Sequence, residues 1–597
     1  MINLEKRIII AFLVVTLIIV LAGIGYVFVF KDQTGLKIIF GPKIDDWKYE
    51  AGIGGVTNKL GGTSGGIKAM DLGLGFATES AGLAPPRGGG NIGFSTGGAK
   101  DINNFRENIK NDYLPLPTDI TYEGLFYDYY FDTGEEQECQ ELFCPSYSYA
   151  VTNDPFSQEK EYYLSVGLNS GIKESDFARK KLNLVVVLDV SGSMGSAFNQ
   201  YYYDQFGNKI NIEEEEEEEG DYQKSKMEIA NEAVVALLDN LNHYDRFGMV
   251  IFESQAYLAK PLRLVGETDM EKVKDHILEI KSRGGTQMSA GMKLGTELYD
   301  ELLEVDQSEY ENRIIFLTDA MPNIGETSEE GLLGMTENNA ANKIYTTFIG
   351  IGVDFNTELV EYITKIRGAN YYSVHSAKQF KTRMADEFEY MVTPLVFNLQ
   401  LNLEAQGYKI EKVYGSPEAN EATGEIMKVN TLFPSKKEAG ETRGGLVLLK
   451  LKKLSPASSL KLRVSYENRQ GEVGGSEAFI NLEDREPEYF TNSGIRKGIL
   501  LCRYADLVKN WIHDERLDYH EPEPIIYSVD EEKGIVVPPI IGPQLNQWER
   551  QSIALQVSSH YQDLFRRFKT YFESEMKALG DNNLTQEVDV LNNLINS

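Results

Sequence analysis

Cysteine and histidine are scarce in this sequence, and several catalytic motifs are missing from it. Its 597 residues include three cysteines and six histidines. Three cysteines cannot form a disulfide-dense scaffold or a four-cysteine zinc module, and no histidine stands at ligand spacing from another histidine or a cysteine. The chain also lacks a Walker-type loop and the HExxH and GxSxG motifs. No Ser/His/Asp set can be assembled either, so the sequence argues against an enzyme.

Basic side chains are few relative to acidic ones. The chain has 59 Lys and Arg residues and 91 Asp and Glu residues, so its formal net charge is −32 at neutral pH. Nucleic-acid binding requires clustered Lys and Arg, so no nucleic-acid partner is expected, whereas cations should be attracted. Apolar residues at 42% and charged residues at 25% are typical of folded chains. A chain of this length should form several domains.

The first long apolar run lies near the amino terminus. Residues 8–30 carry no charge, and a helix of that length spans a bilayer with some tilt. The run is longer than the apolar core of a secretory signal, so we predict a signal anchor over 1–31, with a cleaved signal as the alternative. Lys6 and Arg7 precede the run and favour a cytoplasmic amino terminus. We therefore expect a single-pass membrane protein whose bulk is extracytoplasmic.

Two segments separate this anchor from the next apolar strands. Residues 32–100 are predicted to be a Gly-rich linker or stalk, because 16 of the 54 glycines lie between 51 and 100. Residues 101–180 have a globular composition and form an N-terminal flanking segment. Within it, 122–132 carries six aromatic residues, which we expect to pack against a neighbouring domain rather than to form an exposed binding patch.

Residues 181–392 alternate two kinds of pattern. Near-continuous apolar runs predict strands buried on both faces, as in a parallel sheet, and the segments between them have helical periodicity. This alternation predicts an α/β domain with a doubly wound, mainly parallel sheet. The predicted strands are 183–190, 246–252, 313–319 and 345–352, and the predicted helices are 226–241, 270–281 and 289–303.

The periodicity changes after residue 392. Residues 393–486 contain runs that alternate every two residues, which predicts a β-rich domain with antiparallel strands. Residues 487–597 return to helical periodicity and form a C-terminal helical region. The Pro-punctuated stretch 520–543 is predicted to be a loop within it.

Oxygen donors follow several predicted strands of the α/β domain. The sequence DVSGSMGS places Asp189 at the end of the first strand and Ser191 and Ser193 in the turn after it. GGTQMSAGM supplies Thr286, and LTDAMPN supplies Asp319 at the end of another strand. Ligands of doubly wound sheets bind at the carboxyl ends of the strands, so these side chains can converge on one cation. Hydroxyl and carboxylate oxygens suit Mg²⁺, or alternatively Ca²⁺ or Mn²⁺, rather than zinc or copper.

The order of these five donors resembles the pattern of a von Willebrand factor type A (VWA) domain with a metal-ion-dependent adhesion site. The resemblance covers roughly residues 180–390, and it implies a Rossmann-like fold and a cation held by the five side chains. It also implies that a Glu or Asp carboxylate of a protein partner fills an open coordination position. The alternative is a domain that kept the fold and lost the metal. The flanks are similar to those of bacterial membrane-associated VWA proteins.

One segment departs from the family pattern. An acidic insertion, 196–222, separates the DxSxS motif from the first helix and contains seven consecutive glutamates, Glu213 to Glu219. It could gate the site, concentrate cations near it, or offer a glutamate as an internal ligand. The alternative is a passive, solvated acidic loop.

The cysteines say less about function than the metal motif does. Cys139 and Cys144 are close in sequence, and outside the cytoplasm we expect a short-loop disulfide between them. Cys502 lies in an apolar helical stretch and is expected to be a buried thiol.

These observations predict a membrane-anchored, non-enzymatic protein that binds a partner through a divalent cation, in adhesion or surface assembly. The alternative is a VWA partner of an AAA-type ATPase in intracellular complex assembly, since some VWA domains work with such ATPases. The side of the membrane on which the chain lies would distinguish the two.

Overall fold

The computed structural model describes residues 28–32, 35–39, 43–49, 90–134, 140–210, 224–302, 309–416, 426–455, 459–480, 482–519, 528–530, 535–537 and 545–597. The predicted transmembrane helix therefore lies outside the described residues up to residue 27. For residues 28–30 the predicted helix is wrong, because Phe28–Asp32 form strand β1, which pairs with β2 (Gly35–Ile39). Aromatic and β-branched residues such as Phe28 and Val29 favour a strand. Of the helices within the described ranges, none is long and apolar enough to cross a membrane.

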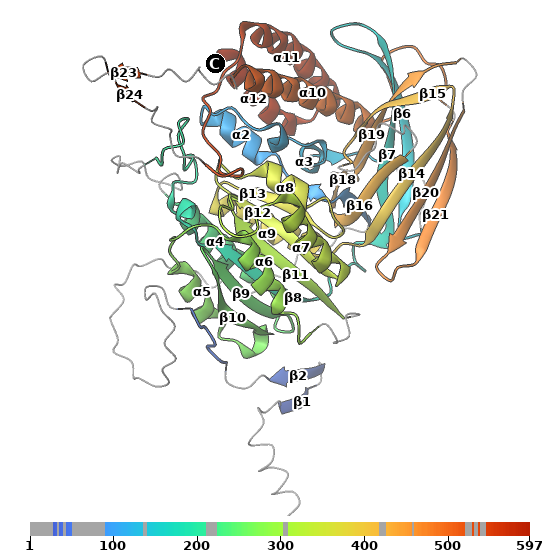
Figure 1. Ribbon diagram of the computed structural model, residues 1–597. Helices are drawn as coiled ribbons and strands as arrows, with labels where there is room; N and C mark the ends of the chain where they lie inside the picture. The colour runs from blue at the N-terminus through green and yellow to red at the C-terminus, as the bar shows by residue number, and fades with distance from the viewer. Residues whose placement is uncertain are drawn as a thin grey trace, which may run out of the picture.

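A mainly parallel sheet forms the centre of the molecule (Figure 1). The strand order is β10-β9-β8-β11-β12-β13-β4, and all neighbours are parallel except β10 and β9. The described residues of β12 are all buried, as expected for a strand covered on both faces. The bounds are β8 (Lys181–Asp189), β9 (Arg246–Phe252), β10 (Ala256–Leu264), β11 (Tyr310–Thr318), β12 (Ile344–Ile351), β13 (Asn370–Val374) and β4 (Gly98–Ala99).

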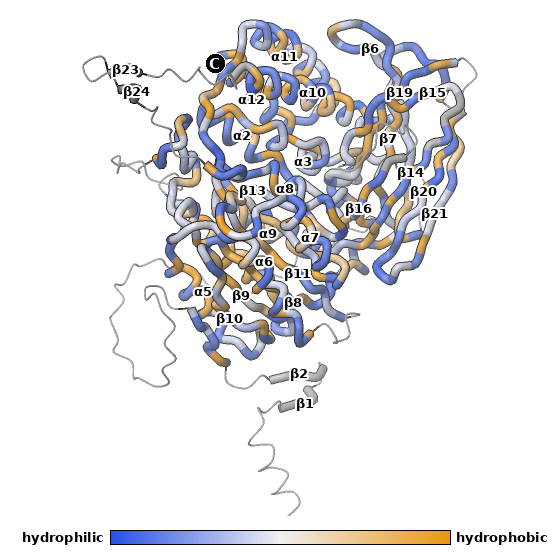
Figure 2. The backbone as a smooth tube through the Cα atoms, in the orientation of Figure 1, coloured by the Kyte–Doolittle hydropathy of each residue, from blue (hydrophilic) through white to orange (hydrophobic). Residues whose placement is uncertain are grey.

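Helices cover both faces of this sheet, so the predicted doubly wound fold is confirmed. Helices α4 (Lys226–Leu238), α5 (Met270–Leu278) and α9 (Ala377–Met391) share one apolar core with the sheet. Helices α6 (Met288–Glu297), α7 (Glu329–Ala341) and α8 (Thr357–Ile363) share the core on the other face. Helix α4 begins where predicted because Ser225 and Glu228 form a capping box. Figure 2 shows the apolar residues concentrated along the strands of this layer.

A second, antiparallel sheet stands beside the α/β domain (Figure 1). Its order is β15-β19-β7-β3-β16-β14-β20-β21, with β6 between β7 and β22. Strands from both ends of this order contribute to one apolar core, so the sheet folds over on itself. The bounds are β3 (Asn91–Thr96), β6 (Cys144–Asn153), β7 (Lys160–Lys173), β14 (Val396–Gln406), β15 (Tyr408–Tyr414), β16 (Ile426–Ser435), β19 (Leu446–Lys453), β20 (Ser459–Asn468), β21 (Val473–Ile480) and β22 (Tyr489–Phe490).

This sheet corrects the predicted domain boundaries. Strands β6 and β7 come from the predicted flank 101–180, and β3 and β4 from the predicted linker 32–100, yet β3 and β7 lie among the strands of 393–486. The linker was predicted from its glycines, but at Gly93 the missing side chain permits close packing instead. A Cβ there would lie 2.0 Å from the Thr442 side chain. The α/β domain is thus an insertion between β7 and β14 of one β-rich unit.

The remaining helices form a third apolar cluster above the α/β domain. Helices α2 and α3 pack there with α10, α11 and α12. Phe126 and Phe131 are at most 1% exposed, so the aromatic segment 122–132 packs internally as predicted. The bounds are α2 (Asn103–Lys110), α3 (Tyr122–Tyr127), α10 (Ser493–Tyr519), α11 (Ser559–Leu579) and α12 (Thr585–Asn596); short strands are β5 (Tyr130–Phe131), β17 (Lys437–Glu438), β18 (Glu441–Arg443), β23 (Ser528–Asp530) and β24 (Ile535–Val537).

The two described cysteines differ in oxidation state. Cys144 is disulfide-bonded, and its predicted partner, Cys139, lies outside the described residues. Cys502 is a free, buried thiol in α10, as expected from its apolar neighbours.

Candidate metal centre

The DxSxS segment leaves the carboxyl end of β8 and turns at once into a short 3₁₀ helix, Gly192–Gly195. Asp189, the last residue of β8, is fully buried. Its Oδ1 accepts a hydrogen bond from the Ser191 amide at 2.8 Å, and its Oδ2 accepts one from the Thr318 hydroxyl at 2.6 Å. The Ser191 and Ser193 hydroxyl oxygens lie 3.1 Å apart. These contacts fix the carboxylate and the two hydroxyls on one side of the turn.

The loop before α6 brings Thr286 to the same edge. The Gly192 amide donates to the Gly284 carbonyl at 3.0 Å, which ties this loop to the DxSxS turn. Thr286 is 3% exposed, and its amide donates to Asn323 Oδ1 at 2.9 Å. Gly284 has φ +74°, and a Cβ there would lie 2.3 Å from the Glu253 carboxylate, so the turn requires glycine.

Asp319 follows β11 and completes the predicted set. It is fully buried, and Lys226 Nζ donates to its Oδ2 at 3.2 Å. The same ammonium group donates to Asp354 Oδ2 at 2.6 Å. Asp319 Oδ1 accepts no well-formed hydrogen bond in the part of the chain that the structure describes, although the Ser193 hydroxyl interacts with the Asp319 carboxylate and opposes the rise in its pKa. A buried carboxylate oxygen without a donor is costly, so this atom marks a position for a cation or another donor.

The electrostatics of the site are unfavourable without a counter-ion. Burial, with the nearby Asp319 carboxylate as the second cause, raises the pKa of Asp189 to about 7. Burial also raises the pKa of Asp319, although Lys226 partly offsets this. With Asp354 included, the site holds three carboxylates and one ammonium group, that of Lys226, which pairs with Asp319 and Asp354. The ionised site therefore has a net charge near −2, which one divalent cation would balance.

The donors present fit a hard divalent cation. Three hydroxyls and two carboxylates are oxygen ligands of the kind that Mg²⁺, Ca²⁺ and Mn²⁺ accept. Across the described ranges, no three His, Cys, Asp or Glu side chains form a metal-binding cluster. A centre here would therefore depend on the hydroxyls of Ser191, Ser193 and Thr286. The structure brings all five predicted side chains together, and cation binding by them stays a prediction.

Sequence reasoning missed further residues of this edge. Asp354 follows the buried strand β12 within GIGVDFN, and the strand-end rule that found Asp319 would also have found it. Lys226 begins α4, and its mostly polar neighbours in sequence, such as Ser225 and Glu228, gave no sign that its side chain is directed into the site. Glu549 comes from the C-terminal region, and nothing in its local sequence connects it to the site.

The chain itself covers this edge of the sheet. A cavity of about 100 Å³ is lined by Ser193 and Thr286 of the candidate centre together with Tyr202, Lys209 and Glu549. Tyr202 and Lys209 belong to the described part of the predicted acidic insertion, 196–222. The seven glutamates lie outside the described residues, so their predicted roles stay open. The described part of the insertion and the C-terminal segment thus both line the cavity beside the candidate centre.

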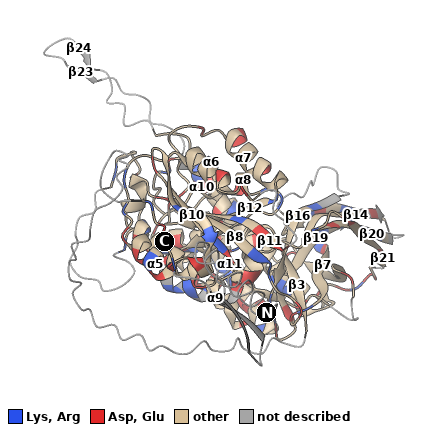
Figure 3. Ribbon diagram, turned by 90° about the horizontal axis from the view of Figure 1, so that it is seen from below, with Lys and Arg blue, Asp and Glu red and all other residues tan. Residues whose placement is uncertain are grey.

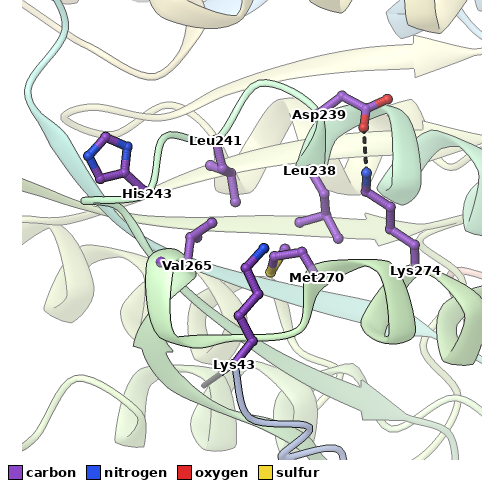
Figure 4. A pocket seen from close by; sticks show the side chains of 9 residues that line it. Lys43, Leu238, Asp239, Leu241, His243, Val265, Met270 and Lys274 are labelled. Carbon is purple, nitrogen blue, oxygen red and sulfur yellow. Dashed lines mark ion pairs between the residues drawn. The ribbon is translucent and has the colours of Figure 1, made fainter. Parts of the chain in front are cut away.

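The opposite edge of the sheet has a larger hollow with different chemistry (Figure 4). It has a volume of about 480 Å³ and is lined by apolar side chains such as Leu238 and Met270. Lys274 forms an ion pair with Asp239 at 2.8 Å at its rim. Figure 3 shows acidic and basic positions interspersed over the molecule in this view, without a basic stripe.

The fold and the site define a doubly wound α/β domain with an oxygen-lined centre at the carboxyl edge of its sheet. Residues 184–322 match the family model of the von Willebrand factor type A domain, and this range includes all five predicted donors. The chain therefore contains a VWA domain, a protein-interaction module, as the motif order predicted.

Curated relatives match over part of the chain. Inter-alpha-trypsin inhibitor heavy chain H4 of Bos taurus is 26% identical over 180 residues, which cover 29% of this chain and 19% of that protein. Heavy chain 4 of Mus musculus is 25% identical over 241 residues, 39% of this chain and 22% of that protein. The chain thus spans about a fifth of the length of the curated relatives it matches.

Solved structures also resemble this chain. A von Willebrand factor type A protein from Catenulispora acidiphila is 14% identical, covers 63% of this chain and 81% of its own, and superposes with a TM-score of 0.37. An aerotolerance-related membrane protein from Bacteroides fragilis is 17% identical, covers 35% of this chain and 98% of its own, and has a TM-score of 0.26. Both scores are low, so these structures add no support beyond the family match.

Proposed function

We propose that this chain is a membrane-anchored, non-enzymatic binding protein whose VWA domain captures an acidic residue of a partner protein through a divalent cation. One observation carries the proposal. The Ser191 and Ser193 hydroxyls lie 3.1 Å apart, the Ser193 side chain also interacts with the Asp319 carboxylate, and the buried Asp319 Oδ1 accepts no well-formed hydrogen bond within the described residues. That arrangement suits a cation better than a purely structural hydrogen-bond network.

Each residue has a distinct part in this proposal. Ser191, Ser193 and Thr286 would hold the ion through their hydroxyl oxygens, and Asp319 through Oδ1, because Lys226 already occupies Oδ2. Asp189 is oriented by the two hydrogen bonds it accepts, so it would act directly or through water. A bound Mg²⁺, Ca²⁺ or Mn²⁺ would supply one Lewis-acidic position for a partner's carboxylate.

The proposed setting is the extracytoplasmic side of a membrane. Residues 8–27 would supply the anchor, because they carry no charge and about 20 apolar residues suffice to span a bilayer. The disulfide at Cys144 supports an oxidising compartment. Protease added outside intact cells should cleave the chain if this orientation is right. Protection of the chain until the cells are lysed would favour a cytoplasmic location instead.

Calorimetric titration of the full-length chain in detergent with Mg²⁺, Ca²⁺ and Mn²⁺ tests the centre. We expect one saturable site that is lost in both Asp189→Ala and Asp319→Ala. The matched control is Asp275→Ala, which removes an exposed carboxylate from α5 and should leave binding unchanged. Absence of binding in the unmodified chain, or binding that survives in Asp319→Ala, would overturn the proposal.

A further inference from the structure

A C-terminal segment, residues 545–557, crosses the carboxyl edge of the VWA sheet. Trp548 is 2% exposed and packs in the core beneath α7 and α8. Its indole Nε1 donates to the Thr327 carbonyl at 2.7 Å, and its own carbonyl accepts from Asn356 Nδ2 at 2.8 Å. Trp548 therefore anchors the backbone immediately before Glu549.

A second anchor follows Glu549. Arg550 is 8% exposed. It donates to the Phe355 carbonyl and to the Tyr201 hydroxyl, both at 2.6 Å. The Ser552 amide donates to the Tyr203 carbonyl at 3.1 Å, so the segment also runs along the insertion. Because both neighbours of Glu549 are held, its side chain is positioned before any ligand binds.

The Glu549 carboxylate faces the candidate metal centre. It lines the same cavity as Ser193 and Thr286. Its Oε1 accepts hydrogen bonds from the Tyr203 hydroxyl at 2.6 Å and from Asn323 Nδ2 at 3.1 Å, and its Oε2 accepts one from the Asn546 amide at 2.7 Å. Asn323 Oδ1 in turn accepts from the Thr286 amide at 2.9 Å. One asparagine side chain thus links the carboxylate directly to the loop that carries a predicted metal ligand.

This placement is unfavourable on charge grounds alone. The centre already holds three carboxylates against Lys226, and Glu549 adds a fourth at its opening. Lys209 also lines the cavity and offsets one of these charges. A divalent cation between Glu549 and Asp319 would turn the remaining repulsion into attraction.

We propose that Glu549 is an internal ligand of the cation site, whose carboxylate takes the coordination position that a partner's acidic residue would otherwise fill. This inference rests on the proposed function and adds a condition to it. A partner carboxylate must displace segment 545–557 before it can bind. Because Glu549 is tethered and held in place, it competes at a high effective concentration, so weak carboxylate ligands are excluded.

Titration of the full-length chain with Mn²⁺, followed by water-proton relaxation, tests the inference without a known partner. The relaxation reports how many exchangeable waters the bound Mn²⁺ retains. In Glu549→Gln, which keeps a hydrogen-bond acceptor for Tyr203 and Asn323, we expect about 10–100-fold weaker Mn²⁺ binding and one additional water. Glu358→Gln, a control at an exposed position on the same edge, should match the unmodified chain.

Sodium acetate, the simplest carboxylate, provides the second arm. Acetate should remove the additional water from Mn²⁺-loaded Glu549→Gln and have no effect on the unmodified chain. If Glu549→Gln binds Mn²⁺ with unchanged affinity and hydration while Asp319→Ala binds none, the internal ligand is refuted and the proposed function stands. If the unmodified chain binds no Mn²⁺, both are refuted.

Discussion

Buried aspartates at the two edges of the VWA sheet differ in how many hydrogen-bond and ion-pair partners they have. At the amino edge, Asp245 is fully buried and pairs with Arg179 through both oxygens, at 3.0 and 2.6 Å. It also accepts hydrogen bonds from the Leu182 and Asn242 amides. At the carboxyl edge, Asp319 is equally buried but shares one ammonium group with Asp354, and its Oδ1 accepts no well-formed hydrogen bond within the described ranges.

Within one sheet, the aspartate at the amino edge therefore serves stability, and the aspartate at the carboxyl edge belongs to the proposed binding site. A buried carboxylate whose oxygens are all paired is stable in the folded chain without any ligand. A buried carboxylate with an open oxygen stores unfavourable free energy that a ligand can release. The amino edge therefore needs no ligand, whereas the cation that we propose at the carboxyl edge would add stability there.

The strongest test of the comparison is Asp245→Asn. The substitution removes the charge that compensates Arg179, whose side chain is 4% exposed. Breaking a buried ion pair by removing one partner costs about 3–5 kcal/mol. Hydrogen–deuterium exchange of β8 and β9 should therefore be faster by a corresponding factor. A loss below about 1 kcal/mol would mean that the amino edge does not depend on this pair.

Asp319→Asn should behave differently at the other edge. Without metal, we expect little loss of stability, because the variant relieves repulsion between carboxylates. Mg²⁺ at 100 times its Kd should stabilise the unmodified chain by about 2.7 kcal/mol and leave Asp319→Asn unchanged. Thermal unfolding with and without Mg²⁺ measures both. Asp275→Asn is the control and should keep the full Mg²⁺ effect; equal Mg²⁺ stabilisation in Asp319→Asn would contradict the assignment.

The sequence predicted the parts of this comparison that depend on local pattern. Apolar runs such as 183–190 marked the buried strands, and the residues that follow them, among them Asp189 and Asp319, lie together as expected. This works because the carboxyl ends of parallel strands meet at one edge. The order of the donors in sequence was therefore enough to place them in space.

Long-range packing could not be predicted in the same way. Strand β3 lies between β7 and β16 although it belongs to a Gly-rich stretch of the sequence that is typical of a linker. Lys226 and Glu549 reach the centre from α4 and from the C-terminal segment. No periodicity or spacing connects such positions, because their proximity is set by how the flanking unit folds around the inserted domain.

The pH dependence of stability should sharpen the comparison. Between its unfolded value near 4 and about 7, the folded Asp189 keeps a proton that the unfolded chain has released. Metal-free stability should therefore fall as pH rises through this window, by at most about 1.4 kcal/mol per pH unit for one proton. Asp189→Asn should reduce that slope, as measured by urea unfolding at several pH values.

A matched control separates this effect from burial in general. Burial, reinforced by the Glu361 carboxylate, raises the pKa of Glu123 to about 8, so its contribution has the same sign. Glu123→Gln should also flatten the slope. Mg²⁺ should abolish the contribution of Asp189 but not that of Glu123, because of these two carboxylates only Asp189 lies at the centre. A slope in the unmodified chain that Mg²⁺ does not change would count against Asp189 as a ligand.

The smallest expected effect lies at the rim of the amino edge, where burial is incomplete. Lys274 pairs with Asp239 at 2.8 Å, but the two side chains are 20% and 46% exposed. Water and salt screen such a pair, so Lys274→Met should change stability by less than about 1 kcal/mol. Urea unfolding at low and high salt measures this, and the difference between the variant and the unmodified chain should shrink further at high salt. A loss as large as that of Asp245→Asn would show that burial does not distinguish these two pairs, and the contrast between Asp245 and Asp319 would then need another explanation.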